Sequence, residues 1–374
     1  MIRLERLLNV VESSCSADEA LATDQKRAKA APVRCGGHRR YSIIVRALSL
    51  ILIVLLLTPG WAGRTRLDLL DAHIPFVATP VALFPEAPAR RRLGTLIYLG
   101  GVSLTSRDPA FGGFSSMAVR GDRVTLLSDG GNLVGFRLGA DWRVHDRHFG
   151  ELPDGPRTGW EKADRDSESL VLDPAGRYAW VGFENLTSIW RYRADFSVAD
   201  AVTMPAPMRR WPTNGGPEAM ARLPDGSFLV LSESQERPPG DRGRAGLWFP
   251  GDPVAHPPGF GFTLVMPAGQ EPTDAAALPD GRILVLTRGL GWRGFTGRLL
   301  VLARDAIRPG ARVRPRELAR FERPALTDNY EALAVTGEQG RTIVWIASDD
   351  NQSRWQRTLL LKFALVEAND KRRR

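Results

Sequence analysis

The sequence predicts an all-β fold, a β-propeller built from four-stranded blades. Residues 218–233, EAMARLPDGSFLVLSE, have the pattern of a β-hairpin, because two runs of strand-forming residues flank a Pro-Asp-Gly turn. Related segments begin at Ser115, Glu168, Asp274 and Glu331, so that successive starts are 50 to 57 residues apart. A period near fifty residues, with two strong strands and space for two weaker ones, is typical of a propeller blade.

The repeat count gives five blades, and the two ends of the chain are expected to share the last one. The fifth repeat continues into a third strand, TLLLKFALV at residues 358–366, and no fourth strand follows it. Residues 93–104, LGTLIYLGGVSL, form a strand candidate before the first repeat. An N-terminal strand that fills this gap would close the ring and leave no open sheet edge.

Residues 1–62 differ in composition from the rest of the chain. Their pattern is typical of a cytoplasmic preamble followed by a signal peptide. The mostly apolar run at residues 47–57 is preceded by arginines and followed by Pro-Gly and small residues. It is shorter than the roughly 20 residues of a spanning helix, so we expect cleavage after Ala62 and a periplasmic or secreted protein. An inner-membrane anchor and a true start near Val45 are the alternatives. Cys15 and Cys35 both lie in this region, which excludes a disulfide framework and a thiol nucleophile in the exported domain.

The rest of the chain divides into a Pro-rich linker or strap (63–92), the propeller (93–366) and a basic tail (367–374). The formal net charge is +9, but residues 1–62 and the tail hold most of the excess. No basic stripe remains on the propeller, so we expect no nucleic-acid partner. We also expect a monomer, with membrane contact only through the signal segment if that segment is not cleaved.

Acidic residues recur at the start of the inner strand and at the end of the second strand of each repeat. Because neighbouring strands of a blade are antiparallel, these two positions lie on the same face. We therefore expect a ring of mostly acidic residues around one mouth of the central channel, with Ser115 in the place of one acid. The ring consists of Asp129, Glu168, Glu184, Glu218, Glu233, Asp274, Arg288, Glu331 and Asp349, and Asp350 and Asn351 extend it.

Carboxylates that converge in one funnel raise each other's pKa, and a bound cation would offset their repulsion. Oxygen ligands favour Ca²⁺ over Zn²⁺, and no histidine stands at an equivalent position of the repeats. In the alternative interpretation these acids cap turns, tie blades together or pair with Arg288, Arg165 and Arg354. The predicted ligands of calcium are Glu168, Glu184, Glu218, Glu233, Asp274, Glu331, Asp349, Asp350 and Asn351.

Taken together, the repeats resemble the phytase-like propeller family of exported proteobacterial proteins, which is described by an esterase-like activity of phytase. The resemblance spans residues 93–365. It implies a propeller of five or six blades and calcium-dependent hydrolysis of phosphate esters or other esters. The segments that carry it are FGGFSSMAV with LLSDGG, DSESL with FEN, NGGPEAMARLPDG with LSE, PTDAAALPDGRILVLTR, and NYEALAV with SDDN.

We therefore expect an exported metal-dependent hydrolase that acts on a small-molecule ester or phosphoester at the acidic funnel. Glu168, Glu218 and Arg288 are the candidate catalytic residues. A Ser115 nucleophile would need a base, and no histidine is evidently paired with it. Because Arg288 is the one cation of the predicted ring, a monoester or a non-phosphate ester fits better than a polyphosphate. The alternative is a non-catalytic propeller that binds a ligand or a protein partner on this face.

Overall fold

The computed structural model describes residues 45–46, 48–50, 69–71, 73–159, 161–212, 215–236 and 242–366. The chain divides into two compact units, residues 1–63 and 64–374, of which the second holds the strands. Cys15, Cys35, the expected cleavage point at Ala62, most of the expected export segment and the basic tail lie outside the described residues. Among the residues that are described, no helix is long and apolar enough to cross a membrane.

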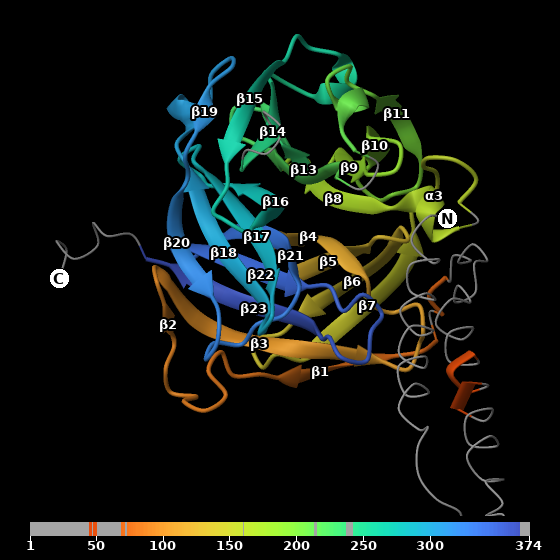
Figure 1. Ribbon diagram of the computed structural model, residues 1–374, viewed down its shortest axis with the longest axis vertical. Helices are drawn as coiled ribbons and strands as arrows, with labels where there is room; N and C mark the ends of the chain where they lie inside the picture. The colour runs from red at the N-terminus through yellow and green to blue at the C-terminus, as the bar shows by residue number, and fades with distance from the viewer. Residues whose placement is uncertain are drawn as a thin grey trace, which may run out of the picture. The chain divides into compact units, whose positions relative to one another are not determined.

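The second unit is a β-propeller of five antiparallel sheets, as Figure 1 shows. The inner strands of the sheets contact each other in the ring order β4, β8, β12, β16, β21 and back to β4. This arrangement confirms the predicted fold and fixes the number of blades at five.

The strands of each blade run outward from the centre in nearly sequential order. Blade 1 comprises β4 (Phe114–Arg120), β5 (Arg123–Ser128), β6 (Asn132–Leu138) and β7 (Val144–Glu151). Blade 2 comprises β8 (Ser167–Leu172), β9 (Tyr178–Phe183), β10 (Ser188–Arg193) and β11 (Ala199–Thr203), and a short helix, α3 (Lys162–Arg165), precedes it. Blade 3 comprises β12 (Pro217–Arg222), β13 (Phe228–Glu236), β14 (Gly243–Phe249) and β15 (Phe260–Val265), with β19 (Arg312–Val313) parallel to β15. Blade 4 comprises β16 (Glu271–Ala277), β17 (Ile283–Gly291), β18 (Gly294–Leu302) and β20 (Arg316–Phe321).

Blade 5 is assembled from both ends of the propeller. Strands β21 (Tyr330–Glu338), β22 (Arg341–Ser348) and β23 (Thr358–Leu365) come from the C-terminal repeat, and β3 (Leu96–Ser106) pairs antiparallel with β23. This pairing confirms that an N-terminal strand closes the ring. Two further strands, β1 (Phe76–Pro80) and β2 (Arg92–Leu93), pair with β3, so part of the Pro-rich stretch extends this sheet.

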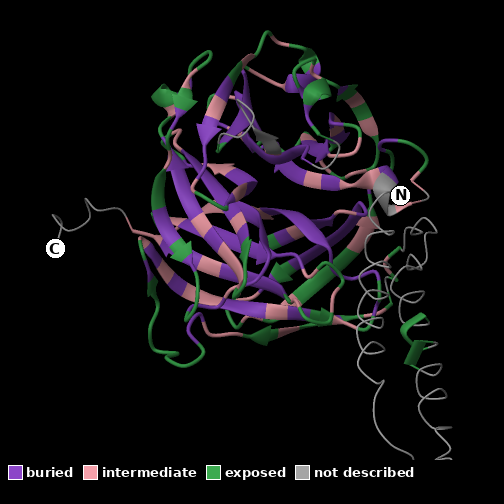
Figure 2. Cartoon of the chain, viewed as in Figure 1, coloured by how far each residue is buried: buried purple, intermediate pink, exposed green. Residues whose placement is uncertain are grey.

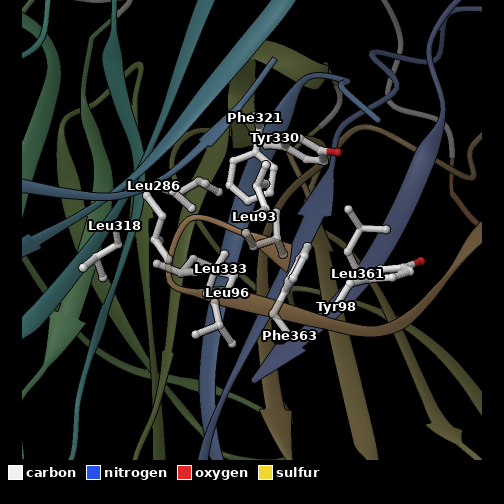
Figure 3. Packing of buried hydrophobic residues seen from close by; sticks show 14 of the residues in the cluster. Leu93, Leu96, Tyr98, Leu286, Leu318, Phe321, Tyr330, Leu333, Leu361 and Phe363 are labelled. Atoms are coloured by element: carbon white, nitrogen blue, oxygen red, sulfur yellow. The ribbon is translucent and has the colours of Figure 1, made fainter. Parts of the chain in front are cut away.

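The hydrophobic core lies between the blades, and the outermost strands are the exposed ones (Figure 2). Figure 3 shows the packing between blades 4 and 5, where Leu286, Phe321, Leu333 and Phe363 meet Leu96 of the closing strand. The rings of Phe321 and Phe363 are 5.9 Å apart in an edge-to-face arrangement. The closing strand is thus held by packing as well as by its hydrogen bonds.

In the described part of the chain, three short 3-10 helices lie between strands of blades 2 to 4. They are η1 (Met208–Arg210), η2 (Pro253–Ala255) and η3 (Arg304–Ala306). The two Pro-Asp-Gly segments form tight turns, and their glycines, Gly226 and Gly281, adopt positive φ values of 87° and 85°. Glycine reaches this region without the steric cost that a side chain would bring.

Every inner strand contains a β-bulge at the same place, close to its start. In each blade the pairing register with the second strand shifts there by one residue, and one side chain is left out of the ladder. A bulge re-aims a side chain relative to the alternating pattern of the strand. The five bulge residues are Ser115, Glu168, Glu218, Thr273 and Glu331.

Candidate functional site: an acidic mouth

The backbone brings the bulge residues next to the ends of the second strands. The N–H groups of Asp129, Glu184 and Asp349 each donate to the carbonyl oxygen of the residue two positions before a bulge, over 2.8, 2.9 and 2.9 Å. In blade 4, Glu271 stands two positions before the bulge, and it pairs in register with Arg288 near the end of the second strand. The repeated hydrogen bond therefore sets side chains from different blades around one opening.

We call this opening the acidic mouth. Among the residues that the structure describes, it contains eight carboxylates, one guanidinium and one amide. Its residues are Asp129, Asp166, Glu168, Glu184, Glu218, Glu233, Arg288, Asn329, Glu331 and Asp349.

Two overlapping triads of carboxylates lie on one side of the mouth. One oxygen from each of Asp166, Glu168 and Glu184 lies within 4.8 Å of the others, and the same holds for Glu184, Glu218 and Glu233. Glu184 therefore belongs to both triads and lies beside Glu218 in the second one. Carboxyl groups at this separation cannot all ionise without strong repulsion.

Arg288 compensates two glutamates of the mouth, Glu331 and Glu233, and Glu233 also belongs to the second triad. Its Nη2 lies 2.5 Å from Glu233 Oε1, and its Nη1 forms an ion pair with Glu331. Asn329 completes this arrangement, because its Oδ1 accepts from Arg288 Nη1 over 3.2 Å and its Nδ2 donates to Glu331 Oε1 over 2.8 Å. Arg288 thus neutralises Glu233 and Glu331, whereas the two triads that share Glu184 form an acidic half that Arg288 reaches only at Glu233.

The pKa values of the mouth carboxyls are raised. Burial and then the negative charge of Asp166 raise the pKa of Glu184 to about 7. Burial also raises the pKa of Glu331 to about 7, although Arg288 and Asn329 oppose the rise. Burial and neighbouring acids raise the pKa of Glu168, Glu218 and Asp349 well above the ordinary range. Burial and mutual repulsion therefore favour the protonated forms of these carboxyl groups.

Asp274 lies one residue past the bulge of its strand, whereas Thr273 occupies the position of the mouth glutamates. Its side chain is 1% exposed, and its two oxygens accept from the N–H groups of Ala275 and Leu333, each over 2.7 Å. Leu333 belongs to the inner strand of the next blade, so Asp274 ties blades 4 and 5 together. The bulge residue Thr273 does the same, because its hydroxyl donates to Tyr330 O over 3.1 Å.

Asp350 and Asn351 follow the mouth residue Asp349 and have local partners. Asp350 accepts from Gly113 N over 3.0 Å and from Thr358 Oγ1 over 2.9 Å, and a Cβ at Gly112 (φ 128°) would meet this carboxylate. Asn351 is exposed and donates to Gln356 Oε1 over 2.9 Å. The structure thus gives Asp350 a role in holding the loop before β4.

Ser115 occupies the bulge of blade 1, in line with the mouth glutamates, but its hydroxyl donates to Ser167 O over 2.5 Å. It links blades 1 and 2. The described histidines lie elsewhere, with His145 and His148 on β7, His73 before β1 and His256 after η2. No described histidine therefore serves Ser115 as a base.

Sequence reasoning missed two residues of the mouth, Asp166 and Asn329. Both stand two positions before a bulge glutamate, in the segments DSE and NYE. Asp166 accepts from Asn185 Nδ2 over 2.6 Å, which holds its carboxylate beside Glu184. The signal that could have found them is this shared repeat position, which the other blades fill with Gly113, Gly216 and Glu271.

The fold and site define a five-bladed propeller with a carboxylate-rich mouth. The chain belongs to the phytase-like family, described as "esterase-like activity of phytase", whose profile matches residues 109–352. No curated protein sequence matches the chain.

Among solved structures, the chain is similar to the PQQ-bound aldose sugar dehydrogenase of Streptomyces coelicolor, with 12% identity and a TM-score of 0.41 over 74% of this chain and 99% of that one. It is also similar to the major allergen Mala s 1 of Malassezia sympodialis, with 11% identity and a TM-score of 0.38 over 77% of this chain and 95% of that one. These similarities are too remote to bear on function.

Proposed function

We propose that the protein is a hydrolase that cleaves a phosphate ester or another ester at its acidic mouth and that it uses Ca²⁺. The observation that carries the proposal is the pair of overlapping carboxylate triads that share Glu184. Membership in the phytase-like family supports a hydrolase-like activity.

The residues of the acidic half fit a hard divalent cation. Asp166, Glu168, Glu184, Glu218 and Glu233 offer only carboxylate oxygens, which are ligands that calcium prefers. The guanidinium of Arg288 reaches Glu233 but forms no ion pair with the other four acids. A bound divalent charge would offset the repulsion that raises their pKa values.

When bound, Ca²⁺ supplies positive charge that polarises the ester group. The chain itself would supply three further functions. Glu184, Glu218 and Glu233 would hold the cation, and Arg288, whose side chain is 26% exposed, would bind negative charge that develops on the ester oxygen. Burial raises the pKa of Glu168, which favours its protonated form, and Glu168 would donate its proton to the leaving group as a water molecule adds to the ester.

A hydrolysis assay tests this proposal. The purified propeller is assayed on p-nitrophenyl phosphate and p-nitrophenyl acetate, with calcium and with a chelator. We expect turnover of one substrate that depends on calcium and falls at least about tenfold in Glu218→Gln and Arg288→Gln. Glu322→Gln, which changes an acid that is 54% exposed, is the matched control and should retain full activity. Absence of turnover with either substrate would contradict the proposal.

A non-catalytic binding protein is the second candidate. Trp292 and Trp355 are each 94% exposed, and Leu290 is 74% exposed. Leu290 lies at the end of β17, Trp292 in the β17–β18 turn and Trp355 in the β22–β23 connection, next to segments that supply Arg288 and Asp349 to the mouth. Large exposed apolar side chains are typical of surfaces that contact a partner, and an inactive but well-folded protein would favour this candidate.

We further propose that the chain is exported to the periplasm or secreted. The basic flank, the apolar run at 47–57 and the small residues before Gly63 support this proposal. N-terminal sequencing of protein from a periplasmic extract should begin at or near Gly63. Recovery of the intact N-terminus from the cytoplasm alone would contradict export.

A further inference from the structure

Three arginines from separate segments line one cavity of about 520 Å³ at the seam between blades 4 and 5. Arg293 lies in the turn between β17 and β18, Arg323 follows β20, and Arg357 precedes β23. Among the described residues of the lining the one acid is Glu86, which is exposed. This cavity, which we call the arginine pocket, therefore concentrates positive charge on a face whose mouth is acidic.

Two of the three guanidinium groups, those of Arg293 and Arg323, are not neutralised by the surrounding described residues, whereas Arg357 is paired with Asp328. Within the part of the chain that the structure describes, Arg293 and Arg323 have no ion-pair partner, and Arg293 lies over the ring of its neighbour Trp292. Arg357 donates through Nε to Asp328 Oδ2 over 3.0 Å and through Nη2 to Thr327 O over 3.2 Å. These two bonds hold Arg357 in place at the wall of the pocket.

The walls between the arginines are apolar. Ala325 and Leu326 are buried, and Pro85 and Pro324 complete the lining. Guanidinium groups bind phosphate oxygens through paired, charge-assisted hydrogen bonds. Several cations around a small cavity favour a dianion over a singly charged carboxylate because each added charge strengthens the attraction.

We infer that the arginine pocket binds the phosphate group of a phosphomonoester, independently of any reaction at the acidic mouth. The two sites are separate but connected along the chain, because Thr327 lines the pocket and Asn329 contacts Arg288 and Glu331 in the mouth. The phosphate can come from a soluble ester or from a lipid headgroup, since both present the same dianion.

Titration with inorganic phosphate and with glycerol 2-phosphate, followed by calorimetry in the presence of chelator, tests the inference. Removal of divalent cations prevents phosphate from binding through a metal at the mouth. We expect one saturable site whose affinity falls at least tenfold, about 1.4 kcal/mol, in Arg323→Gln and in Arg293→Gln. Both arginines are exposed, so these variants should fold like the wild type.

Arg193→Gln is the matched control, because Arg193 is an exposed arginine at the end of β10 and lies outside the pocket. It should bind phosphate like the wild type. Failure of the wild type to bind either ligand saturably, or equal weakening in all three variants, would overturn the inference. Binding that survives in Glu218→Gln would show that the pocket and not the mouth is responsible.

Sedimentation with phosphatidylcholine vesicles, with and without phosphatidic acid, distinguishes the two sources of the phosphate. Binding to the phosphatidic acid vesicles that is lost in Arg323→Gln would identify a lipid headgroup. Phosphate binding in solution without vesicle binding would identify a soluble phosphomonoester.

Discussion

The calcium-free protein should lose stability as the pH rises from about 5 to about 8. The pKa of Glu184 and that of Glu331 are each raised from 4.5 to about 7 in the folded protein. The folded state therefore binds more protons than the unfolded state across this window, and the free energy of unfolding falls as these protons are released. The stabilising contribution of such a group is present at low pH and is lost as the pH rises through about 7.

A pKa difference of about 2.5 units makes the loss about 2 to 3 kcal/mol for one such group between these pH values. Glu168, Glu218 and Asp349 act in the same direction because their pKa values are also raised. Carboxyls with lowered pKa values, such as that of Asp173, lose their contribution only in more acidic solution.

Urea unfolding monitored by tryptophan fluorescence measures this change at both pH values in the presence of chelator. Calcium at a hundredfold excess over its Kd should restore about 2.7 kcal/mol at the higher pH. An unfolding midpoint that is equal at the two pH values, or higher at pH 8, would refute the assignment of raised pKa values. Unchanged stability on addition of calcium would refute the metal site alone.

Three substitutions extend these expectations. Glu218→Gln replaces a buried carboxyl of raised pKa with a neutral amide, so at pH 8 it should stabilise the calcium-free protein by about 1 to 3 kcal/mol. It should also reduce the rise in Tm caused by calcium, whereas Glu322→Gln should do neither. Arg288→Gln leaves two mostly buried glutamates without their cation and should cost about 3 to 5 kcal/mol at pH 8 and less at pH 5, measured by the same urea titration. Asp274→Ala leaves two buried N–H groups unsatisfied and should cost about 2 to 4 kcal/mol with no change in the response to calcium; a lost calcium response would instead make Asp274 a ligand.

The fold could be predicted from sequence because each repeat carries its own local signals. A run of strand-forming residues, a Pro-Asp-Gly turn and a second run specify the two inner strands of blades 3 and 4 without information from the other blades. The closing strand at 96–106 was predictable because a sheet with three strands from one end of the chain leaves an unpaired edge.

The residues of the mouth were harder to predict from the sequence than the fold, because their positions depend on the register between strands. In the segment PTDAAAL both Thr273 and Asp274 are polar, and only the pairing with β17 shows that the bulge falls on Thr273. Asp166 and Asn329 precede their strands, so no strand pattern includes them. The contact of Arg288 with Glu233 and Glu331 joins three blades and has no local sequence signal.

Because β3 pairs with β23, the last strand that the structure describes, blade 5 can be completed only after this C-terminal strand has been synthesised. The edge of β3 that faces β23 stays without its partner until residues 358–365 have been synthesised, so early in folding it is an exposed template for other strands. These two strands are separated by some 250 residues of chain, and contacts of such long range slow folding because loop closure must come first. A break in the chain between two other blades would leave this pairing intact, so circular permutants with new ends at residues 267–269, between β15 of blade 3 and β16 of blade 4, should keep the ring closed.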